Sequence, residues 1–391
     1  MSKHFLRFFM VPMVACAALT ACSDDDDGIS PTSDEQLQDV VAQYVDHVVV
    51  PTYSSLADEA MTLYEACSAL RESKTQANVE SAAAAWIAAR KYWELSEAFL
   101  YGAAADYSID PHIDSWPLDK SALDLTLKNS TLIAQFDADG CNASGFSTLG
   151  FTLLGFHAVE YVIFRDGAPR LVDGGTDTDG VAYKALTDDE VIYCKAVAED
   201  LRNQCIRLEA SWAGTDALTQ AKQEILADAE LEPSTNYGDL LKSAGQPGNV
   251  KYKTVKSALE EMLQGMSDIS DEVGNTKITD PVSSGNVLDV ESWYSWNSIT
   301  DFADNMRGVR NAYYGQTTGK VHDSSLSAVV RAVNADLDSR LRESLDKAVE
   351  AIEAMPAPFR NHLTVAETAE AKAACNEVFA NIESAIEALN E

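Results

Sequence analysis

One short string places a metal-binding nitrogen close to a carboxylate. It reads Gly155-Phe156-His157-Ala158-Val159-Glu160, and helix positions three apart share a face, so His157 and Glu160 could bind one metal ion. A chain with 6 His and 62 acidic residues contains about one such pair by chance. The neighbouring residues are apolar, however, and both groups are costly to bury unpaired. The string permits two interpretations, a metal site or a buried His satisfied by a local Glu.

Two ligands on one helix require further ligands from a facing helix. Oxygen donors with one imidazole suit iron, zinc or manganese better than copper(I). The pattern H-E-x-x-H is absent, which removes the commonest helical signature of zinc proteases. Glu160 would be the general base of a metallopeptidase or a ligand of a binding site, and one carboxylate cannot comfortably fill both roles.

Two other segments carry polar groups among large aromatic residues. Arg90, Trp93, Glu94 and Glu97 recur at helical spacing, and the alternative to a site is a core face with ion pairs on its rim. A following loop adds Asp114 beside Trp116, where simple packing is the alternative. Later in the chain a polar strip is predicted on a helix rich in Trp and Phe, with a solvated helix face as the alternative. The strip consists of Ser295, Asn297, Asp301 and Asn305.

Apolar residues at spacings of three and four predict helices through most of the chain. The predicted ranges are 34–73, with a kink at Pro51, 75–101, 149–164, 188–212, 251–273, 293–314, 324–354 and 364–389. Turn residues gather in 230–250, and no run of alternating strands is present. We therefore predict an all-α fold of two tandem, four-helix-like bundles, 35–229 and 251–391, joined by a linker. The similar aromatic-Gly ends of 86–102 and 293–315 indicate duplication, with chance similarity as the alternative.

The N-terminus is typical of an exported lipoprotein. Lys3 and Arg7 precede an apolar run and then Leu19-Thr20-Ala21-Cys22, which fits a signal peptide over 1–21 that ends in a lipobox. Cys22 would carry acyl chains, and the acidic residues of 22–34 would form a solvated tether. These features predict a lipid anchor in the outer membrane, with the protein facing the periplasm or displayed on the cell surface.

Charge and cysteine content narrow the function further. The chain has 62 Asp and Glu against 29 Lys and Arg, a net charge of −33. Such a surface repels polyanions, which excludes sequence-independent nucleic-acid binding, and attracts cations. No C-x-x-C pair supports a thiolate zinc site. Five cysteines remain outside the signal peptide and Cys22. They permit one disulfide without requiring any, and Cys194 and Cys205 lie too far apart on one predicted helix to bridge each other.

Taken together, these segments resemble the imelysin family of exported bacterial proteins, which are named as metallopeptidases and tied to iron uptake. The resemblance implies two helical bundles related by duplication, with a functional site at their interface that contains His157 and Glu160. It rests on the G-x-H-x-x-E string, the helix 86–102, the loop 113–117, and the segment 291–315 with Ser295, Asn297, Asp301, Asn305 and Gly315.

We expect an extracytoplasmic binding protein for iron or an iron-bearing ligand, with zinc as the alternative metal and other envelope uptake components as partners. His157 and Glu160 would bind the metal together with Asp301. The site would be lined by Gly155, Arg90, Trp93, Glu97, Asp114, Trp116, Ser295, Asn297 and Asn305. The first alternative is a metal-dependent peptidase. The second is a lipoprotein that docks a partner through Trp93 or Trp116 without metal.

Overall fold

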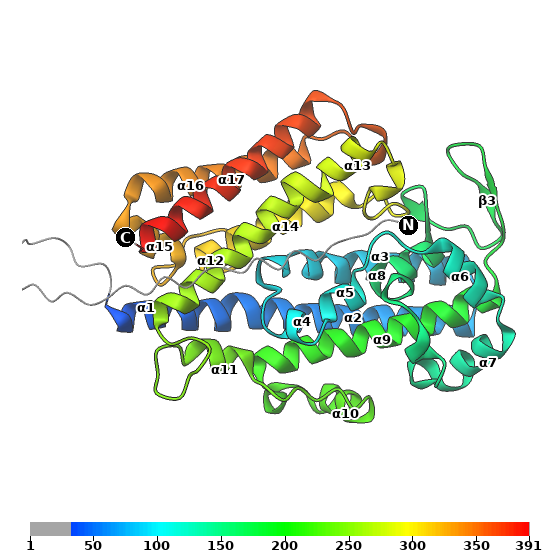
Figure 1. Cartoon of the computed structure of the whole chain (residues 1–391). Coiled ribbons are helices and arrows are strands. Elements are labelled where there is room, and N and C mark those ends of the chain that lie inside the picture. The colour runs from blue at the N-terminus through cyan, green and yellow to red at the C-terminus, as the bar shows by residue number, and fades with distance from the viewer. Residues whose placement is uncertain (1–32, 391) are drawn as a thin grey trace, which may run out of the picture. The chain divides into compact units, whose positions relative to one another are not determined.

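The computed structural model describes residues 33–390, and helices dominate that part of the chain (Figure 1). The predicted signal peptide, Cys22 and nearly all of the acidic tether lie outside the described residues, so these assignments stay predictions. Among the helices that are described, none is both long and apolar enough to serve as a membrane span.

The first half of the chain packs around a long helical rod. Helix α1 (Asp34–Tyr44) continues through a π-helical turn, Val45–Val49, into α2 (Val50–Glu72). The π turn directly precedes Pro51, whose ring nitrogen has no proton to donate to the preceding turn. The helical rod is thus irregular just before Pro51, where the sequence predicts a kink. Helix α2 packs along α3 (Gln76–Glu94) and α9 (Asp188–Ala213), and it buries Leu56, Leu63 and Leu70 completely.

Shorter elements connect these long helices. The predicted loop after α3 contains α4 (Ala103–Asp106) and α5 (Ile109–Ile113). Four more helices complete this half: α6 (Lys120–Leu127), α7 (Ser130–Asp139), α8 (Gly155–Ile163) and α10 (Gln220–Asp228). The polar excursion before α9 forms two small antiparallel hairpins, which pair β1 (Phe164–Arg165) with β2 (Ala168–Pro169) and β3 (Gly175–Thr176) with β4 (Ala182–Tyr183).

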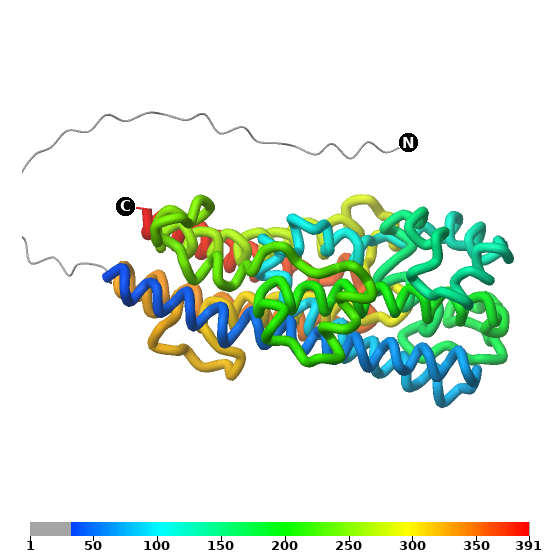
Figure 2. The backbone as a smooth tube through the Cα atoms, turned by 90° about the horizontal axis from the view of Figure 1, so that it is seen from below, coloured from blue at the N-terminus to red at the C-terminus, as the bar shows by residue number. Residues whose placement is uncertain are grey.

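The second half of the chain forms another helical layer. Its elements are α11 (Tyr237–Lys242), α12 (Val255–Glu272), α13 (Thr279–Ser284), α14 (Ser298–Tyr314), α15 (Leu326–Val333), α16 (Ala335–Glu353) and α17 (Ala366–Asn390). Figure 1 shows α14, α16 and α17 on one side and α2 and α9 on the other, and Figure 2 shows the long helices running lengthwise. The described residues, 33–390, belong to one compact unit, within which the division into two bundles at 230–250 stays our interpretation.

The two halves approach each other closely where α14 meets the end of α3. A Cβ atom on Gly308 would lie 2.6 Å from the carbonyl oxygen of Leu95, so only glycine permits this contact. Helix α14 also packs against the 3₁₀ turn Glu97–Phe99, which follows α3. This seam brings residues about 200 positions apart into contact.

The predicted helix 149–164 begins only at Gly155, and the predicted helix 324–354 is divided at Asn334 into α15 and α16. Two further predicted boundaries are wrong at this seam. Helix α3 ends at Glu94 instead of continuing to residue 101, and Gly102 (φ +69°) precedes α4 instead of capping α3. Helix α14 begins at Ser298 instead of Trp293, because Ser292 and Trp296 have left-handed φ angles of 52° and 60°. Gly315 does cap α14 in the left-handed conformation. The two aromatic-Gly ends therefore differ in local structure, and their similarity gives no support to a duplication.

Candidate metal centre

A glycine positions the histidine of the G-x-H-x-x-E string. Gly155 begins α8 with φ +73°, and a Cβ atom there would lie 1.9 Å from the carbonyl oxygen of Ile113. A side chain at this position would therefore push α8 away from the end of α5. The close approach brings Asp114, the residue after α5, to the first turn of α8. His157 and Asp114 thus become neighbours although 43 positions separate them in the sequence.

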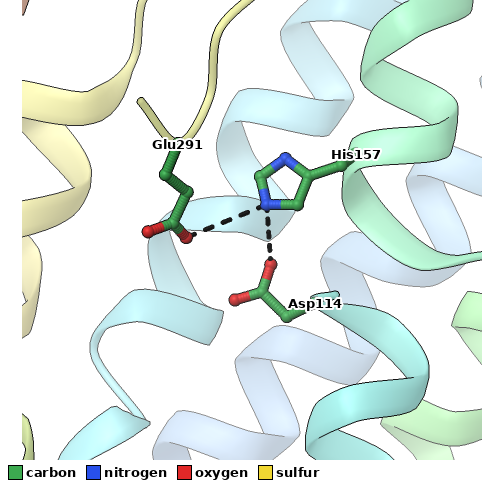
Figure 3. A group of neighbouring side chains, drawn as sticks. All are labelled: Asp114, His157 and Glu291. Atoms are coloured by element: carbon green, nitrogen blue, oxygen red, sulfur yellow. Dashed lines mark ion pairs between the residues drawn. The ribbon is translucent and has the colours of Figure 1, made fainter. Parts of the chain in front are cut away.

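The imidazole of His157 faces two carboxylates from different parts of the chain (Figure 3). Its Nε2 atom lies 3.2 Å from Asp114 Oδ1 and 3.8 Å from Glu291 Oε1. His157 is fully buried, and no hydrogen-bond partner is aligned with Nε2 among the described residues. One ligand atom from each of the three residues lies within 4.8 Å of the other two. Asp114, His157 and Glu291 are called the triad below.

Glu160 binds the other side of the same imidazole ring. Its Oε2 lies 3.0 Å from His157 Nδ1. Its Oε1 accepts hydrogen bonds from the backbone N–H of Tyr294, the backbone N–H of Ser295 and the Ser295 hydroxyl, at 3.0, 2.8 and 2.7 Å. Both oxygens of Glu160 are therefore engaged, one with the Nδ1 side of His157 and the other with Tyr294 and Ser295, on the opposite side of the ring from Asp114 and Glu291. The structure places this residue where it orients the imidazole, not beside His157 as a second ligand.

Arg90 is the nearest cation to the triad. Its guanidinium contacts both Asp114 and Glu291 and lies 2.5 Å from Glu94 Oε1. Arg90 and Glu94 are fully buried, so their ion pair lies inside the molecule and not on the rim of the core face, as the alternative would place it. Trp93 adds a hydrogen bond from Nε1 to Asp114 Oδ2 at 2.6 Å.

A second cation joins the two halves beside Arg90. Lys277 Nζ lies 3.1 Å from Glu97 Oε2 and 3.2 Å from Glu291 Oε2. Asn305 on α14 donates through Nδ2 to Glu94 Oε2 at 2.6 Å and to Glu97 Oε2 at 3.1 Å. Glu97 and Asn305 therefore line the cluster, as predicted from the sequence.

Asp301 lies beyond Arg90 and not in the triad. Its carboxylate accepts hydrogen bonds from Ser292 and Asn297, and its nearest contact with Arg90 Nε is 3.8 Å. The carboxylate that the second half places beside His157 is that of Glu291. Ser295, Asp301 and Asn305 are nevertheless buried, so the alternative of a solvated helix face was wrong.

The cluster holds more negative than positive groups, and the pKa values reflect this. Burial raises the pKa of Glu94 and Glu97 well above the usual range, against the opposing charge of nearby cations. Burial likewise raises the pKa of Asp301 to about 6, with Arg90 opposing. Burial alone would lower the pKa of His157, but the nearby carboxylates outweigh it and raise that pKa well above normal. Excess buried carboxylate favours the uptake of a cation, either a proton or a metal ion.

The sides of the cluster are formed by aromatic rings. The Trp116 ring lies 4.8 Å from the His157 ring and 6.5 Å from the Tyr294 ring, measured between centroids. Trp116 and Tyr294 are partly exposed, whereas His157 is fully buried. Solvent therefore reaches these two rings but not the imidazole beside them.

Two residues of the cluster were missed in the sequence. Glu291 precedes the Trp-rich segment that carries the predicted strip, but helical spacing from Asp301 did not single it out. Lys277 lies in a π-helical turn, Val273–Lys277, and no local pattern marked it. In the sequence, Glu291 is a single acidic residue and Lys277 a single basic residue near a polar, aromatic segment. Single charged residues are common on protein surfaces, so neither was a clear signal.

The fold and the site define a class of protein: a helical body with a buried imidazole and carboxylate cluster at the seam between its halves. The family model described as imelysin, peptidase M75, matches residues 49–387. The chain belongs to the imelysin family, as the sequence predicted.

Individual relatives agree with this assignment. The chain is 28% identical over 321 residues to iron-regulated protein A of Synechococcus elongatus, which covers 82% of this chain and 76% of the relative. A solved structure from Parabacteroides distasonis, provisionally described as an iron-regulated protein A precursor, is 30% identical with a TM-score of 0.77, covering 92% of this chain and 96% of the other. An imelysin-like protein of Psychrobacter arcticum shares the fold at 12% identity and a TM-score of 0.59, covering 91% and 94% of the two chains.

Proposed function

We propose that this protein binds a metal ion, with iron preferred, through Asp114, His157 and Glu291. One observation carries the proposal: a fully buried imidazole nitrogen has no aligned hydrogen-bond partner and faces two carboxylates from other elements. Against the effect of burial, these carboxylates raise the pKa of His157, so that Nε2 holds a proton in the metal-free protein, and a metal ion could replace this proton between the same oxygens. Two carboxylates and one imidazole form a donor set that suits iron, manganese or zinc.

The second shell of the site supports the same function. A metal-ligating histidine usually donates its other ring N–H to a carboxylate, which fixes the tautomer. Glu160 provides that carboxylate at Nδ1, and its other oxygen is held by three donors from the opposite half. The iron preference rests on the relatives that are named iron-regulated protein A. The net charge of −33 would favour the approach of cations.

The positive charge of Arg90 opposes the binding of a metal ion at this site. Its guanidinium contacts the two carboxylates of the triad, so a bound cation would compete with it for the same oxygens. We infer that Arg90 partly neutralises the two carboxylates of the metal-free site and thereby limits the affinity for the metal. This competition would suit a protein that takes up an ion and later releases it, as iron uptake requires.

The geometry of the site supports a peptidase less well than a metal-binding protein. The general base of a metallopeptidase needs a free carboxylate and access for a peptide bond. Glu160 is fully buried, and both its oxygens already accept hydrogen bonds. In this conformation a substrate could not reach it.

We also infer that Cys22 carries acyl chains that anchor the protein to the outer membrane. Mass spectrometry of the N-terminal peptide would test whether Cys22 is acylated.

Metal content measured by elemental analysis tests the main proposal. Protein purified without chelator would be loaded with iron, zinc or manganese and freed of excess metal. We expect stoichiometric iron in the unmodified chain and its loss in His157→Ala. His112→Ala is the matched control, because His112 pairs with Asp200 at 2.7 Å outside the site. Equal metal content in His157→Ala and the unmodified chain would refute the proposal.

A further inference from the structure

Two cysteines meet in the core of the first half, outside the cluster around His157. Cys67 lies on α2 and Cys194 on α9, and their Sγ atoms are 3.8 Å apart. Both side chains are essentially unexposed. The sequence permitted one disulfide but did not indicate the partners, because 127 positions separate these residues.

We propose that Cys67 and Cys194 form a disulfide that ties α2 to α9 when the chain folds in an oxidising environment. A disulfide requires the sulfur atoms to close to about 2.05 Å. Each Sγ atom swings on its Cα–Cβ bond, so a modest change of side-chain torsion can supply that movement while two closely packed helices stay in place. The proposal is independent of whether the protein binds a metal.

The reaction is a thiol–disulfide exchange, and its oxidant is a disulfide such as oxidised glutathione. The thiolate of one cysteine attacks a sulfur of the oxidant and releases one reduced thiol. The second cysteine then displaces the other oxidant thiol, and the Sγ–Sγ bond forms. In total the two cysteines lose two protons and two electrons, and the oxidant becomes two thiols.

The structure also indicates when the exchange has to occur. The hydrogen bond between Cys194 and Cys67, together with burial, favours the neutral thiol and raises the pKa of Cys194 well above normal, and only the thiolate is reactive. In the folded protein these thiols are therefore slow to react, and because both are buried an oxidant could not reach them. The bond would therefore form during folding, before α2 and α9 have packed fully against each other. This timing requires that the chain meets the oxidising environment before it has folded.

Stability is the expected consequence. The bond would close a loop of more than one hundred residues, and long loops lose the most conformational entropy when cross-linked in the unfolded state. We expect the oxidised protein to melt roughly 5 °C above the reduced protein. The melting temperature of each protein is compared between its own oxidised and reduced states. The destabilising effect of a cavity left by a substitution is the same in both states and therefore cancels.

Peptide mapping of the full-length protein tests the pairing directly. The denatured chain would be refolded with oxidised and reduced glutathione, its free thiols alkylated, and its peptides mapped without reduction. We expect Cys67 and Cys194 to be recovered in one cross-linked pair. Free, alkylated Cys67 and Cys194 in the refolded protein would overturn the proposal, and so would preferential linkage of either residue to another cysteine.

Variants provide the second measurement. Cys67→Ala and Cys194→Ala should each abolish the difference in melting temperature between oxidised and reduced protein. Cys205→Ala is the matched control, because Cys205 is a buried thiol on the same helix α9, and it should retain the full difference. A difference that survives in Cys67→Ala would contradict the proposal, even if the variant is less stable overall.

Discussion

The Nδ1 atom of His157 and the Oε2 atom of Glu160 lie 3.0 Å apart, and this contact decides which ring nitrogen faces the seam. The raised pKa of His157 means that Nε2 also carries a proton in the metal-free protein. A metal ion would displace that proton, while the proton on Nδ1 stays donated to Glu160 and the Nε2 lone pair is directed toward Asp114 and Glu291. The spacing that first drew attention in the sequence therefore serves orientation. The carboxylates that face Nε2 come from outside the string.

Glu160→Gln tests this division of roles. The amide oxygen would still accept from the backbone of Tyr294 and Ser295, so the amide NH₂ group would face His157. Nδ1 would then have to accept, the proton would move to Nε2, and metal affinity should fall about 10- to 100-fold. Competition with a chromogenic chelator measures the affinity, and circular dichroism confirms the fold. An unchanged affinity would show that Glu160 does not set the tautomer.

Arg90→Met tests the inferred competition between the guanidinium and a metal. Removal of one partner from a buried ion cluster costs about 3–5 kcal/mol of unfolding free energy. Excess carboxylate would then favour metal, so we expect tighter binding of zinc, a redox-inert probe, and partial recovery of stability when zinc is added.

Arg170→Met is the matched control for this experiment. Arg170 is also buried and lies 2.8 Å from Glu190, outside the metal centre. Loss of Arg170 should lower the unfolding free energy, and added zinc should not restore it. If both variants respond equally to zinc, or neither does, the competition is disproved.

Gly155→Ala tests the close approach of α8 to α5. The new methyl group would overlap the Ile113 carbonyl oxygen, 1.9 Å away, and the positive φ adds strain of about 1 kcal/mol. We expect a loss of at least ~2 kcal/mol in urea unfolding, together with the loss of metal binding. Gly180→Ala separates the two causes, because Gly180 has φ +79° but nothing within 4 Å of its Cβ position. Equal losses in the two variants would mean that strain alone is responsible.

Acid stability should depend on Glu190 at the start of α9. Burial alone would raise its pKa, but hydrogen bonds and charge from Arg170, with hydrogen bonds from Thr187, lower it below the ordinary 4.5. A carboxyl with a lowered folded pKa stabilises the protein above its unfolded pKa and loses that contribution as the pH falls through the folded value. The gap in unfolding free energy between the unmodified chain and Glu190→Gln should therefore stay constant at neutral pH and shrink below about pH 4.5. Urea unfolding from pH 7 to pH 3 measures it, and a gap unchanged at pH 3 would contradict the assignment.

The sequence by itself determined the helical class, most helix positions and the family. These properties depend on local spacing: apolar residues three and four apart define a helix face wherever that helix later packs. For the same reason His157, Glu160, Arg90 and Glu94 could be singled out in advance. The helix ends at the seam could not be, because left-handed backbone at Ser292 and Trp296 depends on contacts from the other half.

Only the tertiary structure decided which groups meet. Asp301 seemed the natural ligand from the second half, yet Arg90 and two local donors hold it, and Glu291 takes the place beside His157. The pairing of Cys67 with Cys194 was equally invisible in the sequence. Such contacts join residues 127 or 134 positions apart, and their geometry is set by how whole helices pack. Spacing along the chain carries no information about that packing.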